Sequence, residues 1–419
     1  MKIDSEIYYN QLQKKYSRKI TLGLSRVKRA LTLLGNPQHR LKNPINIIGS
    51  DGKFSCLTSL KYFIEANGES TTTFISPHLY DLKSRIWLKN RFITLNEIKR
   101  YEKQISKLRV NLSLFEVLTL IYILAATKVK SSYNLVESGL LFKKDSTNIF
   151  KNPLLQACTN INKQHLEWIS PATINEVCKQ KVGYLNNQTN IYIGKQKPKT
   201  LKIIKKILKK NKSKITYPSN WRIIYKKDKI YYKDQKYKIT IRSNYIHSKG
   251  LIDNLGLAIK IALDLKISPK IIEKTIPKIF FEGRLQYINR GKLRKYVHKN
   301  EKILLDGAHS NTSGKNLYDY LKSLKLPIYC IWGMQKNKLP KNFLKNFKGI
   351  FKKIVTIKIP NEPNSCSAEQ LKLIALKQNY QVEIANNFKE ALKKITSNKP
   401  KVICFMGSLY LIGSILKEN

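Results

Sequence analysis

Acidic residues are scarce in this chain of 419 residues: 27 Asp and Glu stand against 79 Lys and Arg, which gives a formal net charge of +52. Such a charge favours anionic partners, with nucleic acid first among them. The lysines are, however, spread along the whole chain with many Ile and Asn, and no zinc-finger or RNA-recognition signature is present. We therefore interpret the charge as a bias of composition and expect no nucleic-acid partner, while basic nucleic-acid binding stays open as an alternative.

Long apolar runs and paired cysteines are also lacking. The longest apolar stretch, residues 114–126, is too short to cross a bilayer and contains Glu116, and the first fifteen residues have no apolar signal-peptide core. The six cysteines form no CxxC pair and mostly stand among apolar residues, as buried free thiols do in a reducing compartment. These absences predict a soluble, cytoplasmic protein without membrane contact.

The apolar residues that are present make up 42% of the chain, which is enough to form the cores of two or three domains. Strand-like and helix-like patterns alternate almost throughout, which is typical of a doubly wound parallel sheet. The segment at residues 215–241 is rich in Tyr and Ile and predicts a small antiparallel excursion of strands. The alternation of strands and helices restarts after Arg284. We therefore expect two α/β domains, residues 1–286 and 287–419, with ligands bound in a cleft between them beyond the carboxyl ends of the strands.

Residues 45–66 predict a strand, a glycine turn and a helix in succession. The β-branched run at residues 45–48 fits a buried strand, and apolar residues at helical spacing follow the turn. The turn, GSDGKFS at residues 49–55, offers free backbone N–H groups and a helix dipole to an anion, and its lysine adds charge. Asn46 stands where the Walker pattern needs a glycine. On these residues alone, a phosphate loop and an ordinary strand-to-helix turn are both open.

Short polar motifs follow the predicted strands. In chain order they are FISPHLYDLKSRI, VESGLLFKKDSTN, TNINKQHLEWI, CKQKVG, FEGRLQ, LLDGAHSNTSG, IWGMQKNK and FMGSLYLIG. With the glycine turn, they resemble the folylpolyglutamate synthase / dihydrofolate synthase family of the Mur ligase superfamily, over nearly the whole chain from about Leu22 to Ile415. The resemblance favours the phosphate loop over the ordinary turn. It implies an α/β fold with an N-terminal P-loop-type ATPase domain and a C-terminal Rossmann-like domain of the glutamate-ligase type.

The activity that the resemblance implies is the ATP-dependent joining of L-glutamate to dihydropteroate, to (tetrahydro)folate polyglutamate, or to both. The acceptor carboxylate is phosphorylated to an acyl phosphate, and the amine of glutamate then attacks it. Such an enzyme is a carbon–nitrogen ligase of folate biosynthesis and one-carbon metabolism. A related ligase that makes peptidoglycan precursors is disfavoured by the motifs SPHL and GSLYLIG.

The resemblance also gives roles to individual residues, in four sets. The nucleotide-binding set is Gly49, Gly52, Lys53, Ser55, Asn254, Arg284 and Asp306. The magnesium ligands are Ser76, Glu137 and His165, and the substrate-binding residues are His78, Asp145 and Asn148. The catalytic residues are Lys53, Lys181 and His309.

Two lysines have the most defined implied chemistry. Lys53 is expected to contact the β- and γ-phosphates of ATP, and Lys181 matches a lysine that the family carbamylates. A buried lysine with a lowered pKa can accept CO₂ and becomes a carboxylate-like ligand of Mg²⁺. Arg284, Asp306 and His309 are expected at the cleft between the domains. The implied ligands are therefore ATP, Mg²⁺, L-glutamate and dihydropteroate or folates, bound by a protein that we expect to be a monomer.

Each of these roles has an ordinary structural alternative. Glu137 can be a strand-end residue, His165 can be a histidine packed beside Trp168, and Lys181 can be one more solvated lysine in a Lys-rich chain.

The sequence departs from the family at several loops. Phe54 is bulky for a phosphate loop, residues 141–143 replace a Gly-Gly-Arg segment, and Gln164 and Gln180 stand where acidic residues are usual. A catalytically weakened relative that binds nucleotide or folate is therefore a further alternative to an active ligase.

Overall fold

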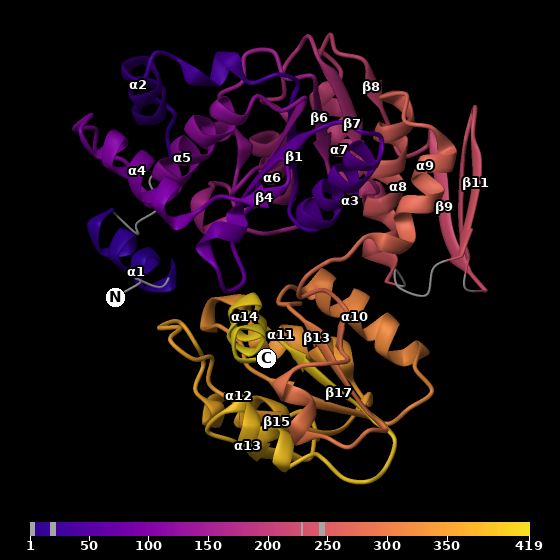
Figure 1. The fold of residues 1–419 in the computed structure, drawn as a ribbon. Helices are drawn as coiled ribbons and strands as arrows, with labels where there is room; N and C mark the ends of the chain where they lie inside the picture. The colour runs from indigo at the N-terminus through magenta and orange to yellow at the C-terminus, as the bar shows by residue number, and fades with distance from the viewer. Residues whose placement is uncertain (1–4, 17–21, 228, 243–247) are drawn as a thin grey trace. The chain divides into compact units, whose positions relative to one another are not determined.

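The computed structural model describes residues 5–16, 22–227, 229–242 and 248–419. The chain divides into two compact units, of which the first comprises Met1–His247 with Leu251–Ile279 and the second Ser248–Gly250 with Phe280–Asn419. The second unit is coloured orange to yellow in Figure 1, apart from its first three residues. The division of the chain into domains at residues 1–286 and 287–419 stays a prediction.

The first unit is built on an eight-stranded sheet in the order β4-β3-β2-β5-β1-β6-β7-β8. Its strands are β1 (Pro44–Ile48), β2 (Thr71–Phe74), β3 (Ile86–Leu88), β4 (Arg91–Phe92), β5 (Tyr133–Glu137), β6 (Leu155–Cys158), β7 (Asn190–Ile193) and β8 (Ile215–Thr216). β3 and β4 are added antiparallel at one edge, and all other neighbours run parallel. Because β1 lies between β5 and β6, the loop that follows β1 emerges at the middle of the carboxyl edge.

The helices of this part of the chain, seen in Figure 1, are α1 (Ser5–Lys15), α2 (Ser25–Leu33), α3 (Lys53–Ala66), α4 (Leu95–Ser106), α5 (Leu114–Val129), α6 (Ile174–Val182), α7 (Pro198–Leu208), α8 (Lys249–Asp264) and α9 (Pro269–Thr275). α3 packs on β1, β2 and β5, while α5 packs on β2 and β3. A three-stranded antiparallel sheet, β9 (Trp221–Lys226), β10 (Lys229–Asp234) and β11 (Lys238–Arg242), confirms the predicted excursion.

The apolar run at residues 114–126 forms most of α5, which is buried along nearly its whole length. Its single acid, Glu116, closes a capping box, because the backbone N–H and the hydroxyl of Ser113 both donate to its Oε2 at 2.8 Å. Arg26 pairs with the other carboxylate oxygen at 3.0 Å. Among the described residues, no helix is long and apolar enough to cross a membrane.

The second unit holds a six-stranded sheet in the order β12-β13-β17-β14-β15-β16. Its strands are β12 (Gln286–Ile288), β13 (Glu301–Asp306), β14 (Ile328–Trp332), β15 (Phe351–Thr356), β16 (Val382–Ile384) and β17 (Lys401–Met406). Its helices are α10 (Asn311–Ser323), α11 (Pro340–Leu344), α12 (Ala368–Leu376), α13 (Phe388–Lys393) and α14 (Leu409–Glu418). Only β12 runs antiparallel to its neighbour, so the alternation predicts this sheet correctly. The six cysteines are buried free thiols, as expected.

Candidate active site

The glycine turn joins the end of β1 to the first residue of α3, Lys53. Gly49 and Gly52 have φ angles of +147° and +88°, which L side chains rarely adopt. A Cβ atom at Gly49 would lie 2.0 Å from Oγ1 of Thr159, and one at Gly52 would lie 2.2 Å from Nδ2 of Asn254. Both positions therefore need glycine, and the turn is held against two other segments of the first unit.

Lys53 and Glu137 meet beside this turn. Nζ of Lys53 donates to the carbonyl oxygens of Gly49 and Ser50, each at 3.3 Å, and lies 3.8 Å from Oε1 of Glu137. Only 11% of the lysine side chain and 5% of the glutamate side chain are exposed. The other carboxylate oxygen of Glu137 accepts from the backbone N–H of Ser76 at 3.3 Å. The structure thus brings Lys53, Glu137 and Ser76 together, although they come from the start of α3, the end of β5 and the loop after β2.

Lys181 approaches the same turn from α6. Its side chain is fully buried, and its Nζ donates to the carbonyl oxygen of Gly49 at 2.9 Å and to that of Leu140. Burial, assisted by the charge of Lys53, lowers the pKa of Lys181 to about 7. The alternative of a solvated surface lysine is therefore wrong.

Ser55 and Asn254 close the other side of the turn. Nδ2 of Asn254 donates to the Ser55 hydroxyl at 2.9 Å, and that hydroxyl donates to the carbonyl of Gly52 at 3.0 Å. Asn254 lies on α8 and reaches the turn across 199 positions of the sequence. Asn254, a predicted nucleotide-binding residue, is thus packed against the glycine turn.

His165 is half-buried at the start of a 3-10 helix, Leu166–Trp168, with a left-handed φ of +60°. Within the part of the chain that the structure describes, no three His, Cys, Asp or Glu side chains gather closely enough to hold a metal ion. The buried carboxylate of Glu137 beside Lys53 nevertheless suits Mg²⁺, which takes one or two carboxylates and completes its shell with phosphate oxygens and water. The residues present therefore fit a magnesium ion bound together with a nucleotide.

His78 has a defined tautomer. Nε of Arg85 donates to its Nδ1 at 2.7 Å, so the ring proton is carried by Nε2, and the Tyr9 ring packs edge-on at 4.6 Å. Burial, together with the charge of Arg85, lowers the pKa of His78 well below its usual value. A neutral donor at this position can contact an anionic or carbonyl oxygen of a substrate. Sequence reasoning missed Arg85 and Tyr9, because only the fold brings Tyr9 to the loop.

Asp145 is engaged in its own loop. Its carboxylate accepts from the backbone N–H groups of Leu140 and Thr147 and from the Thr147 hydroxyl, at 2.9, 3.0 and 2.6 Å. This loop also contains the Leu140 carbonyl that accepts from Lys181. Asp145 is thus placed to order the segment that replaces the family's Gly-Gly-Arg.

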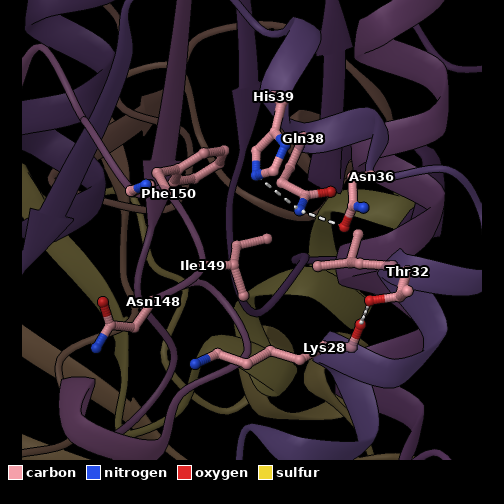
Figure 2. Close-up of a pocket in the computed structure, with 10 residues that line it drawn as sticks. Lys28, Thr32, Asn36, Gln38, His39, Asn148, Ile149 and Phe150 are labelled. Atoms are coloured by element: carbon pink, nitrogen blue, oxygen red, sulfur yellow. Dashed lines mark hydrogen bonds between the residues drawn. The ribbon is translucent and has the colours of Figure 1, made fainter.

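Asn148 lines a cavity of about 390 Å³ (Figure 2). The other lining residues are Lys28, Leu31, Thr32, Asn36, Gln38, His39, Ile149, Phe150 and Lys151. Among the described residues, the glycine turn at residues 49–55 contributes none of this lining.

The three predicted residues of the second unit meet at the end of β13. Asp306 is buried and accepts from the backbone N–H groups of Leu285 and Ala308 at 2.9 and 2.8 Å. Burial raises its pKa, and the nearby charge of Arg284 opposes that rise. Nδ1 of His309 donates to the carbonyl of Gly307 at 2.8 Å, which leaves Nε2 without a proton when the ring is neutral.

Comparisons with known proteins agree with this architecture. Residues 289–418 match a family model described as dihydrofolate synthetase, C-terminal domain. The chain is 24% identical to dihydrofolate synthetase of Saccharomyces cerevisiae over 95% of this chain and 98% of the relative. It is 23% identical to dihydrofolate synthase/folylpolyglutamate synthase of Bacillus subtilis over 94% of each.

Solved structures give the same result for the fold. Mycobacterium tuberculosis folylpolyglutamate synthase complexed with ADP superposes with a TM-score of 0.85 at 20% identity, over 98% of this chain and 97% of that one. E. coli FolC in complex with DHPP and ADP gives a TM-score of 0.85 at 18% identity, over 99% of this chain and 97% of that one. This likeness confirms the predicted α/β fold class. The family model and the curated relatives support the predicted folylpolyglutamate synthase / dihydrofolate synthase family and the predicted class of ligase.

Proposed function

We propose that the chain joins L-glutamate to dihydropteroate, to folate polyglutamates, or to both, at the expense of ATP and through an acyl phosphate. The observation that carries the proposal is the meeting of Lys53 and Glu137 at a glycine turn that follows β1, an inner strand of a mostly parallel sheet. The names of the relatives support the acceptor class. ATP and a divalent metal are supported by a Yersinia pestis bifunctional folylpolyglutamate synthase/dihydrofolate synthase complexed with AMPPNP and Mn ion, with a TM-score of 0.85 at 17% identity.

In this proposal, Lys53 moves its ammonium from the carbonyls of Gly49 and Ser50 to the phosphates of ATP. Glu137 and Ser76 would hold Mg²⁺ with the help of His165, and the bound ion would neutralise charge on the β- and γ-phosphates. Gly49, Gly52 and Ser55 would present the loop to the nucleotide, since its free N–H groups stand at the start of α3. Charge neutralisation and positioning are the main requirements of phosphoryl transfer. Lys53, the magnesium ligands and the glycine turn would together supply both.

Lys181 would be carbamylated. Its pKa of about 7 leaves a large neutral fraction at neutral pH, and a neutral amine adds CO₂ to give a carbamate and a proton. The carbonyls of Gly49 and Leu140 that now accept from Nζ would then be released. Carbon-13 NMR after equilibration with labelled bicarbonate should show a carbamate resonance that is absent in Lys181→Ala. Its absence in the wild type would exclude the modification.

The second unit would contribute Arg284, Asp306 and His309 to the nucleotide and its phosphates. Asn254 would contact the base. His78, Asp145 and Asn148 would contact the acceptor, with the Nε2 proton of His78 as a donor. We further propose a cytoplasmic monomer without a nucleic-acid partner, which light scattering and nucleic-acid titration at several salt concentrations would test.

The function is tested by ADP release from the purified protein with ATP and Mg²⁺. Dihydropteroate plus glutamate and tetrahydrofolate plus glutamate are the two substrate sets. Lys53→Ala should abolish release, whereas Lys202→Ala, which changes an exposed lysine of α7, should not. Release that requires both substrates supports the ligase and identifies its acceptor. A folded protein that binds ATP but releases no ADP with either set would instead be a weakened, ligand-binding relative.

A further inference from the structure

Asp51, in the middle of the phosphate loop, connects that loop to the segment before His165. Its two carboxylate oxygens each accept from a different side-chain amide. Oδ2 accepts from Nδ2 of Asn162 at 2.7 Å, and Oδ1 accepts from Nε2 of Gln164 at 3.0 Å. One acidic side chain therefore links two positions that lie more than 110 residues further along the chain.

The backbone on both sides reinforces this connection. Asp51 forms an antiparallel bridge with Asn160, and the N–H of Ser50 donates to the carbonyl of Asn160 at 2.8 Å. The Ser50 hydroxyl donates to the carbonyl of Asn162 at 3.3 Å and accepts from the N–H of Asn162 at 3.0 Å. Residues 50–51 and 160–164 are thus joined by backbone and side-chain bonds, and Gln164 is the last position held before His165.

We propose that Asp51 and Gln164 are positioning residues, which fix His165 relative to the phosphate loop through one carboxylate–amide pair. The proposal rests on the proposed function, because His165 is assigned to the magnesium site there. His165 directly follows Gln164 in the chain, and its backbone has a left-handed φ of +60°. If the pair is lost, the loop and His165 can no longer be presented together to magnesium and nucleotide.

The chemistry of the pair makes it testable by exchange. Asp51→Asn removes the charge that both amides contact and, in the present side-chain orientations, places an NH₂ group against an NH₂ group. Gln164→Glu places two carboxylates at the 3.0 Å separation of the present bond, which is repulsive. In the double variant D51N/Q164E, the carboxylate introduced at position 164 accepts from the amide introduced at position 51, whose oxygen can still accept from Asn162. The exchange therefore restores both of these hydrogen bonds, with the acid and the amide reversed.

The experiment compares wild type, D51N, Q164E and the double variant. We expect the KM for Mg·ATP to rise roughly threefold to tenfold in each single variant, and to return to within about twofold of wild type in the double variant, because contacting residues couple. Gln188→Glu makes the same chemical change at an exposed residue and should leave the KM unchanged. A double variant as impaired as the worse single one would overturn the proposal. Single variants that lose melting temperature but keep the wild-type KM would overturn it too, since the pair would then be structural only.

A second measurement separates this proposal from the proposed function. Amide hydrogen exchange in the peptide covering residues 159–165 does not depend on turnover. Exchange there should be faster in both single variants and should return to the wild-type rate in the double variant. If the wild type releases no ADP but the exchange pattern is restored, the function fails and the pairing stands. If exchange is not restored in the double variant, the pairing itself is refuted.

Discussion

Replacing Gly52 by alanine should destabilise the first unit by an amount that the structure determines. The residue has φ +88°, and an added Cβ would lie 2.2 Å from Nδ2 of Asn254. The left-handed backbone costs an alanine about 1–2 kcal/mol. Displacing Asn254 also breaks its 2.9 Å hydrogen bond to Ser55, which is worth about 0.5–1.5 kcal/mol. The total expected loss is therefore about 1.5–3.5 kcal/mol.

The chain provides a matched control for the backbone part of this loss. Gly68 has φ +86°, but nothing lies within 4 Å of a Cβ added there. Gly68→Ala should therefore lose only the backbone part, about 1–2 kcal/mol. In Gly52→Ala combined with Asn254→Ala the obstructing amide is absent, so Gly52→Ala should cost less in the Asn254→Ala background than in the wild type.

The assay is urea unfolding followed by tryptophan fluorescence, with free energies compared at common denaturant concentrations. Equal losses for Gly52→Ala and Gly68→Ala would refute the packing of Asn254 against the loop. An unchanged cost of Gly52→Ala in the Asn254→Ala background would refute it as well.

Three further predictions concern the ionisable groups of the site. Burial lowers the pKa of Lys181 from about 10.5 to about 7, so between these pH values the unfolded chain binds one more proton than the folded chain. The free energy of unfolding should therefore rise from pH 7 to pH 9 in the wild type, but not in Lys181→Met. Equal slopes of this free energy against pH in the two proteins, measured by urea titration, would contradict the prediction. Glu137→Gln should reduce ADP release about tenfold or more, because Lys53 and the proposed metal ion lose a carboxylate. Glu69→Gln, at an exposed residue, should have no effect in the same assay. Arg85→Lys should raise the KM for the acceptor more than it lowers kcat, because His78 loses the guanidinium donor that keeps its proton on Nε2. An unchanged KM for the acceptor in steady-state kinetics would exclude this positioning role of Arg85.

The local elements of this fold are predictable from the sequence. A β-branched run, a glycine turn and helical spacing predict β1 and α3, and the Tyr- and Ile-rich segment at residues 215–241 predicts the antiparallel sheet. Strand order is not predictable in this way. β1 comes first in the chain yet lies between β5 and β6, because pairing depends on contacts between distant segments.

The site is predictable only in part, for the same reason. The motifs identify Lys53 and Glu137, but nothing local indicates that Glu137 lies 3.8 Å from Lys53. The burial of Lys181 is hidden by a composition in which lysine is common everywhere. Asp51 appears in the sequence only as a departure from a family pattern. The structure gives it two amide partners that no short-range signal could reveal.

The most direct test of the proposed ligase is mass spectrometry of its product. The protein would be incubated with ATP, Mg²⁺, dihydropteroate and nitrogen-15 L-glutamate, and separately with tetrahydrofolate in place of dihydropteroate. We predict a product that carries one labelled glutamyl residue for each ADP released, with at least one of the two acceptors. ADP release without a labelled product, or no product from a folded protein that binds ATP, would contradict the proposed function.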